Sequence, residues 1–261
     1  MPVIPVTEDE KIAFRSLCET VKNQTPIRQN IGTYKEKQLH ATLKRFCEPV
    51  SGLHEKKIGN YTVDIFNEEG AVEIQTGSFY PMHKKLETLL PYTNVRIVHP
   101  LCTDRRLIWI DPETGETTKP RRSPHHADVY DCARDFYWIR DLLGFPSLTV
   151  ELLFLECDEY RLRDGWGNGG KRGSHRDMLV PRELVSRVVL HGKADYDALL
   201  PSSLPDPFTV GDLSAVLRRT YDESRYLVKT WLALGTVTEL PAKGRKKLYS
   251  RIADETEQMR K

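Results

Sequence analysis

The chain has 261 residues, 39 of them basic and 37 acidic, so its overall charge does not by itself indicate a nucleic-acid partner. Five cysteines, an odd number without a CxxC spacing, argue against a disulfide framework and favour a reducing compartment. We find no basic segment followed by an apolar one at the N-terminus and no apolar run of membrane-spanning length. These features predict a soluble cytoplasmic protein, with no membrane partner and with room for one large domain or two.

Two helices are predicted before the first strand. Thr7 to Glu10 has the form of a capping box and opens a helix to about Val21. A second capping-box pattern, at Thr33 to Glu36, opens a helix that ends near Phe46. Glu36 and His40 lie one turn apart on it and are placed to face the strands that follow. Glu36 is equally well explained as part of the helix cap.

Val63 to Thr76 reads as two strands joined by a tight turn at Asn67 to Gly70. Side-chain alternation puts Asp64, Glu73 and Gln75 on one face. If the turn is centred on residues 68 and 69, the two acids oppose each other, and at about 5 Å and an effective dielectric of about 20 they repel by roughly 3 kcal/mol. A divalent cation held by carboxylate oxygens would offset this repulsion. The alternative is an exposed hairpin whose acids are solvated.

The elements around this hairpin have a recognisable order. A strand over His54 to Ile58 precedes it, a helix over Met82 to Leu90 follows it, and Asn94 to His99 is an apolar strand. Residues 33–99 therefore predict a helix, a three-stranded meander, a helix and a strand. A helix followed by an apolar strand favours α/β layering, with the last strand returning into the sheet.

This order and its acids resemble the restriction-endonuclease-like, PD-(D/E)XK nuclease superfamily. The resemblance implies an α/β fold with a mixed sheet flanked by helices, and phosphodiester hydrolysis with Mg²⁺ or Mn²⁺ as cofactor. It implies Glu36, Asp64 and Glu73 as the acids of the site. Asp64, Glu73 and the backbone carbonyl of Ile74 would be the metal ligands.

The chain departs from the family pattern at two positions. Val63 stands where the family name has proline, a residue that many members lack, and Gln75 stands in place of the lysine. The resemblance therefore leaves open which cation acts beside the metal. Lys84 and Lys85 in the following helix are the leading candidates, and Lys37 is a third.

The middle of the chain predicts two apolar strands, Arg105 to Asp111 and Leu148 to Glu156, separated by a helix over Ala127 to Leu143 whose aromatic residues belong mainly to the core. The histidines and cysteines between His99 and Cys132 match no compact zinc pattern. Residues 161–176 form a glycine-rich basic loop that suits a sugar-phosphate backbone, or else a plain surface loop. Its candidate DNA contacts are Arg163, Trp166, Lys171 and Arg172.

Residues 201–207, PSSLPDP, predict a linker between a first domain over 1–200 and a second over 208–254, with a charged tail at 255–261. The second domain reads as two capped helices, Thr209 to Leu217 and Thr220 to Leu234, followed by a two-stranded hairpin with a basic tip. It resembles a small α+β winged helix-turn-helix domain. By that resemblance the DNA contacts are Ser224, Arg225, Lys229, Lys243, Arg245, Lys246 and Lys247.

Together the two halves predict a Mg²⁺-dependent DNA endonuclease that its C-terminal domain delivers to DNA. The alternative is a non-catalytic DNA-binding regulator built on a nuclease-like scaffold. A winged helix also serves as a protein–protein module, which is a third reading. The sequence leaves the oligomeric state open, with a homodimer as one option, because many nucleases of this class cut both strands as dimers.

Overall fold

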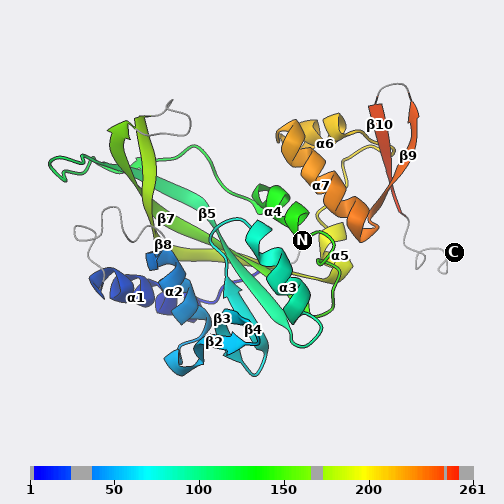
Figure 1. Ribbon diagram of the computed structural model, residues 1–261. Coiled ribbons are helices and arrows are strands. Elements are labelled where there is room, and N and C mark those ends of the chain that lie inside the picture. The colour runs from blue at the N-terminus through cyan, green and yellow to red at the C-terminus, as the bar shows by residue number, and fades with distance from the viewer. Residues whose placement is uncertain (1–2, 25–36, 166–172, 244–245, 253–261) are drawn as a thin grey trace.

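The computed structural model describes residues 3–24, 37–165, 173–243 and 246–252 (Figure 1). An eight-stranded mixed sheet runs in the order β1, β8, β7, β5, β4, β3, β2, with β6 paired to β5. β4, β5 and β7 are parallel, whereas the other neighbours are antiparallel. The strands are β1 Val3–Ile4, β2 His54–Ile58, β3 Tyr61–Asn67, β4 Gly70–Ile74, β5 Val95–Ile110, β6 Arg121–Arg122, β7 Leu148–Gly165 and β8 Gly173–His191.

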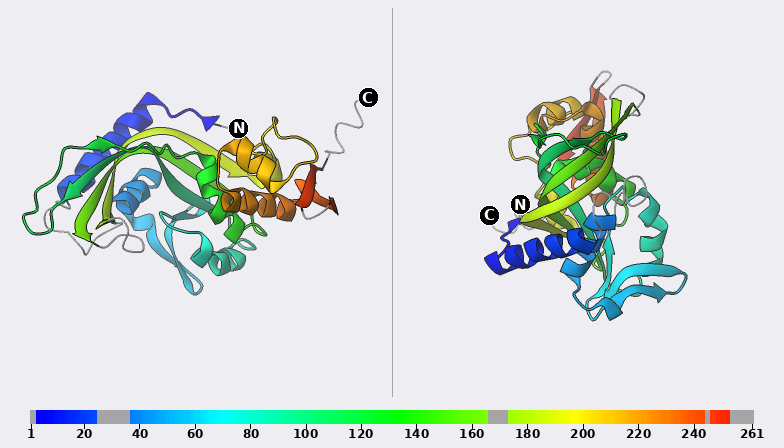
Figure 2. Two further views of the ribbon diagram at one scale, coloured as in Figure 1. Left: turned by 90° about the horizontal axis from the view of Figure 1, so that it is seen from above. Right: turned by 90° about the vertical axis from the view of Figure 1, so that its left-hand side faces the viewer.

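Helices cover both faces of this sheet, as Figures 1 and 2 show. Residues of α1 and α2, such as Phe14 and Leu43, pack on one face in a cluster with Val98. Residues of α3 and α4, such as Leu86 and Phe136, belong to a larger cluster. The helices before the C-terminal part are α1 Glu8–Gln24, α2 Lys37–Cys47, α3 His83–Leu89, α4 Ala133–Trp138 and α5 Gly192–Asp197.

The predicted helix, meander, helix and strand are confirmed as α2, β2 to β4, α3 and β5. Asn67 pairs with Gly70 and Ile65 with Val72, so the turn is centred where the sequence indicated. If the pairing of β3 with β4 is extended by one residue beyond Ile65 and Val72, Asp64 lies opposite Glu73. β5 then returns beside β4 in the parallel direction, which places the acids next to the centre of the sheet.

Gly70 holds the start of β4 against the segment that leads into β5. Its φ is +122°, and a Cβ at this position would lie 2.4 Å from the backbone oxygen of Asn94. We therefore expect Gly70→Ala to lower the free energy of unfolding by about 2–4 kcal/mol, because backbone strain and overpacking each cost about 1–3 kcal/mol. Chemical denaturation of this variant measures the loss.

The matched control for this prediction is Gly59→Ala. Gly59 also has a positive φ, +57°, but no atom lies within 4 Å of the position of an added Cβ. Its substitution should therefore cost only about 1 kcal/mol, the strain of a left-handed residue. Equal losses at Gly59 and Gly70 would show that the contact with Asn94 adds nothing.

β5, β7 and β8 are longer than the sequence predicted, and they project from the body as an arm (Figure 1). β5 joins two predicted strands into one, and β7 and β8 take up much of the loop predicted over 161–176. Cross-strand ion pairs hold the arm together, since Arg106 Nε lies 2.6 Å from Asp158 Oδ1 and Arg105 Nη1 lies 2.9 Å from Glu159 Oε2. Many basic residues of the arm are therefore already paired with acids.

The helix predicted over Ala127 to Leu143 is wrong in its extent. A 3₁₀ turn over Val129–Cys132 comes first, and α4 then ends at Trp138. The side chain of Asp128 accepts a hydrogen bond from the backbone N–H of Tyr130 at 2.8 Å, which favours a tight turn over an α-helix at this point. Phe136 is buried as predicted, but Tyr137 and Trp138 are only half-buried.

The C-terminal part contains the predicted order of two helices and a hairpin. The elements are α6 Val210–Leu217, α7 Tyr221–Leu234, β9 Val237–Lys243 and β10 Lys246–Arg251. Thr220 caps α7 in a capping box with Glu223, and Gly235 ends it with a φ of +67°. Phe208 pairs with Tyr249 of β10 in an isolated bridge.

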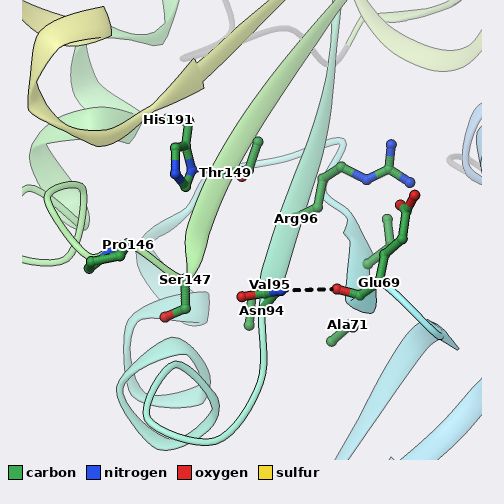
Figure 3. A pocket seen from close by; sticks show the side chains of 11 residues that line it. Glu69, Ala71, Asn94, Val95, Arg96, Pro146, Ser147, Thr149 and His191 are labelled. Atoms are coloured by element: carbon green, nitrogen blue, oxygen red, sulfur yellow. Dashed lines mark hydrogen bonds between the residues drawn. The ribbon is translucent and has the colours of Figure 1, made fainter.

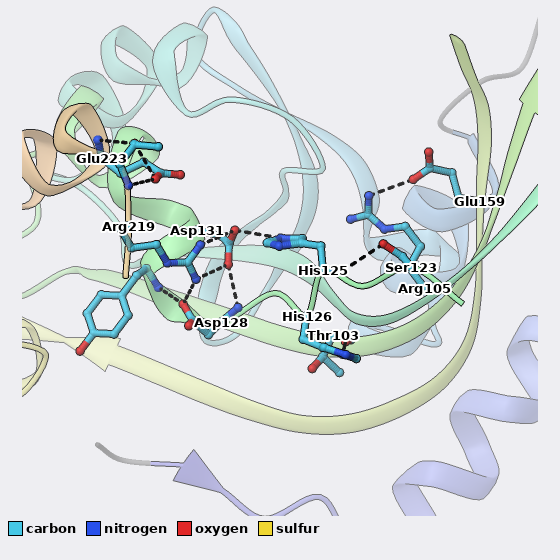
Figure 4. Close-up of polar contacts among 12 residues, drawn as sticks. Thr103, Arg105, Ser123, His125, His126, Asp128, Asp131, Glu159, Arg219 and Glu223 are labelled. Carbon is cyan, nitrogen blue, oxygen red and sulfur yellow. Dashed lines mark hydrogen bonds and ion pairs between the residues drawn. The ribbon is translucent and has the colours of Figure 1, made fainter. Parts of the chain in front are cut away.

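This part is not joined to the sheet by a free tether. Trp231 of α7 is buried in the larger hydrophobic cluster, and its Nε1–H donates to the carbonyl of Tyr196 at 3.0 Å. Leu204, within the predicted linker, belongs to the same cluster. Figure 4 shows a polar contact at the junction, where Arg219 lies 3.0 Å from Asp131 and 2.7 Å from Asp128. None of the helices in the described ranges is long and apolar enough to cross a membrane.

Candidate functional site

Asp64 of β3 is held by groups from two neighbouring elements. His40 Nε2 of α2 lies 3.2 Å from Asp64 Oδ2, Lys44 Nζ lies 3.1 Å from Oδ1, and the backbone N–H of Ile74 donates to Oδ2 at 2.9 Å. Burial alone would raise the pKa of Asp64, but the hydrogen bonds from His40, Ile74 and Lys44 together lower this pKa to about 2. The carboxyl group is therefore ionised at neutral pH.

Glu73 of β4 is the second acid, and only 8% of its surface is exposed. Lys85 Nζ of α3 lies 2.5 Å from Glu73 Oε1 and 2.7 Å from the carbonyl oxygen of Thr62. Burial raises the pKa of Glu73, and the negative charge of Asp64 adds to this effect, whereas Lys85 lowers it. Oε1 is the oxygen that faces Lys85 Nζ, so a cation bound at Glu73 would lie beside this lysine.

These observations test whether the residues suit a divalent cation. Mg²⁺ and Mn²⁺ prefer oxygen ligands, which Asp64 and Glu73 supply from adjacent strands. The buried Oε1 of Glu73 forms an ion pair with Lys85. The negative charge of Asp64 raises the pKa of Glu73, because the two carboxylates repel each other. The donor set fits a hard cation.

The remaining residues predicted for the active site lie in different places. The side-chain amide of Gln75 donates to the carbonyl of Ser78 at 2.6 Å, so it faces its own turn. Lys84 is exposed, whereas Lys85 is the lysine that reaches the acids. Ile74 ends β4 beside Asp64, which its N–H contacts. Glu36 and the side chain of Lys37 lie outside the described residues.

Lys44 is the site residue that the sequence analysis missed. It contacts Asp64 and also Glu55, which lies on β2. The signal that would have found it is its spacing, because Lys44 follows His40 by four residues and shares its face of α2. The same helix face therefore supplies two basic groups to one carboxylate.

The predicted DNA contacts divide into three groups. Ser224 is fully buried and its hydroxyl donates to the carbonyl of Thr220 at 3.0 Å, so its prediction as a DNA contact is wrong. Exposed basic side chains are found at Arg163, Arg225, Lys229, Lys246 and Lys247. Trp166, Lys171, Arg172, Arg245 and the side chain of Lys243 lie outside the described residues.

The described residues contain two other features that resemble binding sites. A cavity of about 250 Å³ lies at the opposite end of β4 from Glu73 (Figure 3). Its basic side chain Arg96 is already paired with Glu151 at 3.0 Å. His83, Glu87 and Asp141 come within 4.8 Å of one another at the surface, an arrangement that is common without a metal. Neither feature combines a buried acid and a partly buried one with lysines as the β3–β4 hairpin does.

The fold is that of an α/β protein with a mixed sheet and a small C-terminal unit of helices and a hairpin. A family model described as a domain of unknown function (DUF8091) matches residues 37–191, more than half of the 261 residues, and the chain belongs to this family. The matched range begins with α2 and ends with β8. An uncharacterized protein of Treponema pallidum (strain Nichols) is 28% identical over 224 residues, which cover 84% of this chain and 86% of that protein. No solved structure matches the chain.

Proposed function

We propose that this protein is a metal-dependent DNA nuclease that hydrolyses phosphodiester bonds. The observation that carries the proposal is the opposition of Asp64 and Glu73 on β3 and β4, with Lys85 beside Glu73. The order of α2, the meander, α3 and the parallel β5 supports it, because this is the arrangement that the nuclease resemblance implies. The cation is Mg²⁺ or Mn²⁺, held by Asp64, Glu73 and the carbonyl of Ile74.

When bound, the cation supplies Lewis-acid chemistry, because it lowers the pKa of water and polarises a phosphoryl oxygen. His40 and Lys44 keep Asp64 ionised, so this carboxylate is ready to bind a cation at neutral pH. The N–H of Ile74 fixes the Asp64 side chain against β4. Lys85 supplies the positive charge that Gln75 lacks, and from beside Glu73 it is positioned to stabilise negative charge on a phosphate.

Duplex delivery is assigned to the winged-helix part, α6 to β10. Arg225 and Lys229 of α7 are exposed, and Lys246 and Lys247 are exposed at the start of β10. Arg225 lies 2.9 Å from Asp222 on the same helix, and Lys247 of β10 lies 2.8 Å from Glu239 of the paired strand β9. These are exposed ion pairs, which contribute little to stability and exchange readily for phosphate.

One observation favours the second candidate, a DNA-binding regulator without catalysis. Lys44 and Lys85 already neutralise Asp64 and Glu73, so the pair is compensated without a cation. In this reading the lysines replace the metal and the hairpin is a structural remnant of a nuclease. DNA binding would then persist in EDTA, with the steep salt dependence of phosphate contacts.

Cleavage of plasmid, linear duplex and single-stranded DNA separates the two candidates. The reactions contain Mg²⁺, Mn²⁺ or EDTA, and binding to the same DNAs is measured in parallel. The nuclease proposal expects products with either metal and none in EDTA. Tight, salt-dependent binding without products from any substrate would favour the regulator.

A further inference from the structure

A continuous row of aromatic rings crosses the surface between the candidate acids and the winged-helix part. The ring of Tyr80 lies 4.7 Å from that of Trp138, Trp138 lies 5.4 Å from Tyr137, and Tyr137 lies 4.9 Å from Tyr226. These residues come from the turn before α3, from α4 and from α7, and we call the four rings the aromatic strip. α4 packs against α7, so the strip bridges both parts of the chain.

Basic side chains lie over the rings of the strip. The guanidinium carbon of Arg134 is 6.0 Å from the centre of the Trp138 ring, and that of Arg140 is 4.3 Å from the centre of Tyr137. Lys229 Nζ lies 5.3 Å from Tyr137, and Arg225 lies 5.7 Å from Tyr226. Trp138 and Tyr226 therefore each have a cation over the ring, and Tyr137 has two.

The strip lies at the edge of the hydrophobic core. Tyr80 is 64% exposed, whereas Tyr137, Trp138 and Tyr226 are partly exposed, and Tyr226 also packs against the larger hydrophobic cluster. Exposing large rings to water is unfavourable, and a patch of them marks a binding surface more often than a lone exposed residue does. Cations held over half-exposed rings suit a ligand with both π-faces and negative charge.

Each end of the strip meets a feature with a proposed role in DNA chemistry. Tyr80 lies on the segment between β4 and α3, two residues after Ser78, the partner of the Gln75 amide, and this segment leads into α3, which carries Lys85. At the other end, Arg225 and Lys229 line a cavity of about 560 Å³ between α7 and the hairpin of β9 and β10. Tyr221, 59% exposed, lies on the wall of this cavity.

We propose that the aromatic strip binds single-stranded DNA and leads it from the cavity beside α7 towards Asp64 and Glu73. The direction of this path rests on the proposed nuclease function, whereas the binding of single-stranded DNA to the strip does not. Unpaired bases stack on aromatic side chains whatever their sequence, while the neighbouring cations contact phosphates. A duplex keeps its bases stacked inside the helix, so it gains less from such a surface.

The test is the anisotropy of a fluorescent oligothymidylate of about 16 nucleotides, the upper length of a typical single-strand site. Binding is measured in EDTA, where cleavage does not interfere. Tyr80→Ala is expected to weaken binding by about 5-fold to 150-fold, because one stacked base contributes about 1–3 kcal/mol. Arg134→Gln should reduce the slope of log K against log salt by about 0.7, the value for one phosphate contact on a single strand.

Tyr92→Ala is the matched control, because Tyr92 is the same residue type, is 87% exposed and lies outside the strip in the segment between α3 and β5. It should bind the oligonucleotide as the unaltered protein does. Tyr80→Ala should leave the binding of a duplex of the same length unchanged, because duplex binding is assigned to the winged-helix part and the bases of a duplex do not stack on the strip. Unchanged binding by both Tyr80→Ala and Arg134→Gln would overturn the proposal.

The two proposals fail in different ways. If the Tyr80→Ala variant loses single-strand binding while the unaltered protein cuts no DNA with any metal, the strip stands and the nuclease proposal falls. If the unaltered protein cuts DNA with Mg²⁺ while both strip variants bind single strands normally, the nuclease stands and the strip falls.

Discussion

Replacing Glu73 with glutamine is expected to slow metal-dependent cleavage by at least about 100-fold, since even residues that only support a metal ligand are typically worth about 10–100-fold. Glu73 would be a direct ligand, and glutamine keeps its shape but removes the charge. The substitution also removes the repulsion that Asp64 exerts on Glu73. Cleavage of plasmid DNA with Mg²⁺ measures the loss, and the thermal unfolding of the variant shows whether the protein stays folded.

Glu87→Gln is the matched control for this prediction. Glu87 is an exposed acid on α3, and it belongs to the surface group with His83 and Asp141. Its replacement should leave cleavage unchanged, because the group is assigned no metal. Cleavage that survives Glu73→Gln but not Glu87→Gln would move the metal centre to that surface group.

Replacing Trp231 with alanine is expected to destabilise the whole chain by about 3–5 kcal/mol, the usual cost of removing a buried tryptophan side chain. Trp231 is buried in the cluster that contains residues from both the sheet and the C-terminal part, and it donates to the carbonyl of Tyr196. Because the two parts share this core, the loss should appear in one cooperative transition. Denaturation followed by far-ultraviolet circular dichroism measures it.

Trp231→Phe separates the packing of this side chain from its hydrogen bond. Phenylalanine keeps most of the buried apolar surface but removes one of the donors to the carbonyl of Tyr196, which still accepts from the N–H of Leu199 at 3.2 Å, so the cost should be about 0.5–1.5 kcal/mol. Two separate transitions in the Trp231→Ala variant, with only the smaller one shifted, would instead show that the C-terminal part folds as an independent domain.

The sequence predicts best those elements whose boundaries are set by local chemistry. Asn67 and Gly70 define the hairpin turn. The position of this turn sets the strand register, which places Asp64 opposite Glu73. Thr220 and Gly235 define both ends of α7 in the same way. In each case the deciding interactions are a few residues apart, so they can be read without the rest of the fold.

β8 was not predicted because its pattern is broken by its own irregularities. Pro181 lies within it opposite Cys157, and a proline usually argues against a strand with neighbours on both sides. The register with β7 shifts between Glu156 and Cys157, next to this position, so a bulge accommodates the ring. Only the pairing with β7 and β1 reveals this strand as part of the sheet.

The site was predictable for its acids but not for its cations. Asp64 and Glu73 follow from strand alternation and one turn, whereas choosing between Lys84 and Lys85 requires the rotation of α3. That rotation is set by the 3₁₀ turn over Tyr80–Met82, which packs Met82 and Leu86 into the core. Lys85 consequently faces Glu73, and Lys84 faces solvent.

Titration of the protein with Mn²⁺, followed by the electron paramagnetic resonance signal of the free ion, tests most directly whether the β3–β4 acids hold a cation. We expect the unaltered protein and Glu87→Gln to bind Mn²⁺, and Asp64→Asn and Glu73→Gln, both still folded, to bind none. Equal Mn²⁺ binding by all four proteins, or binding lost only in Glu87→Gln, would contradict it.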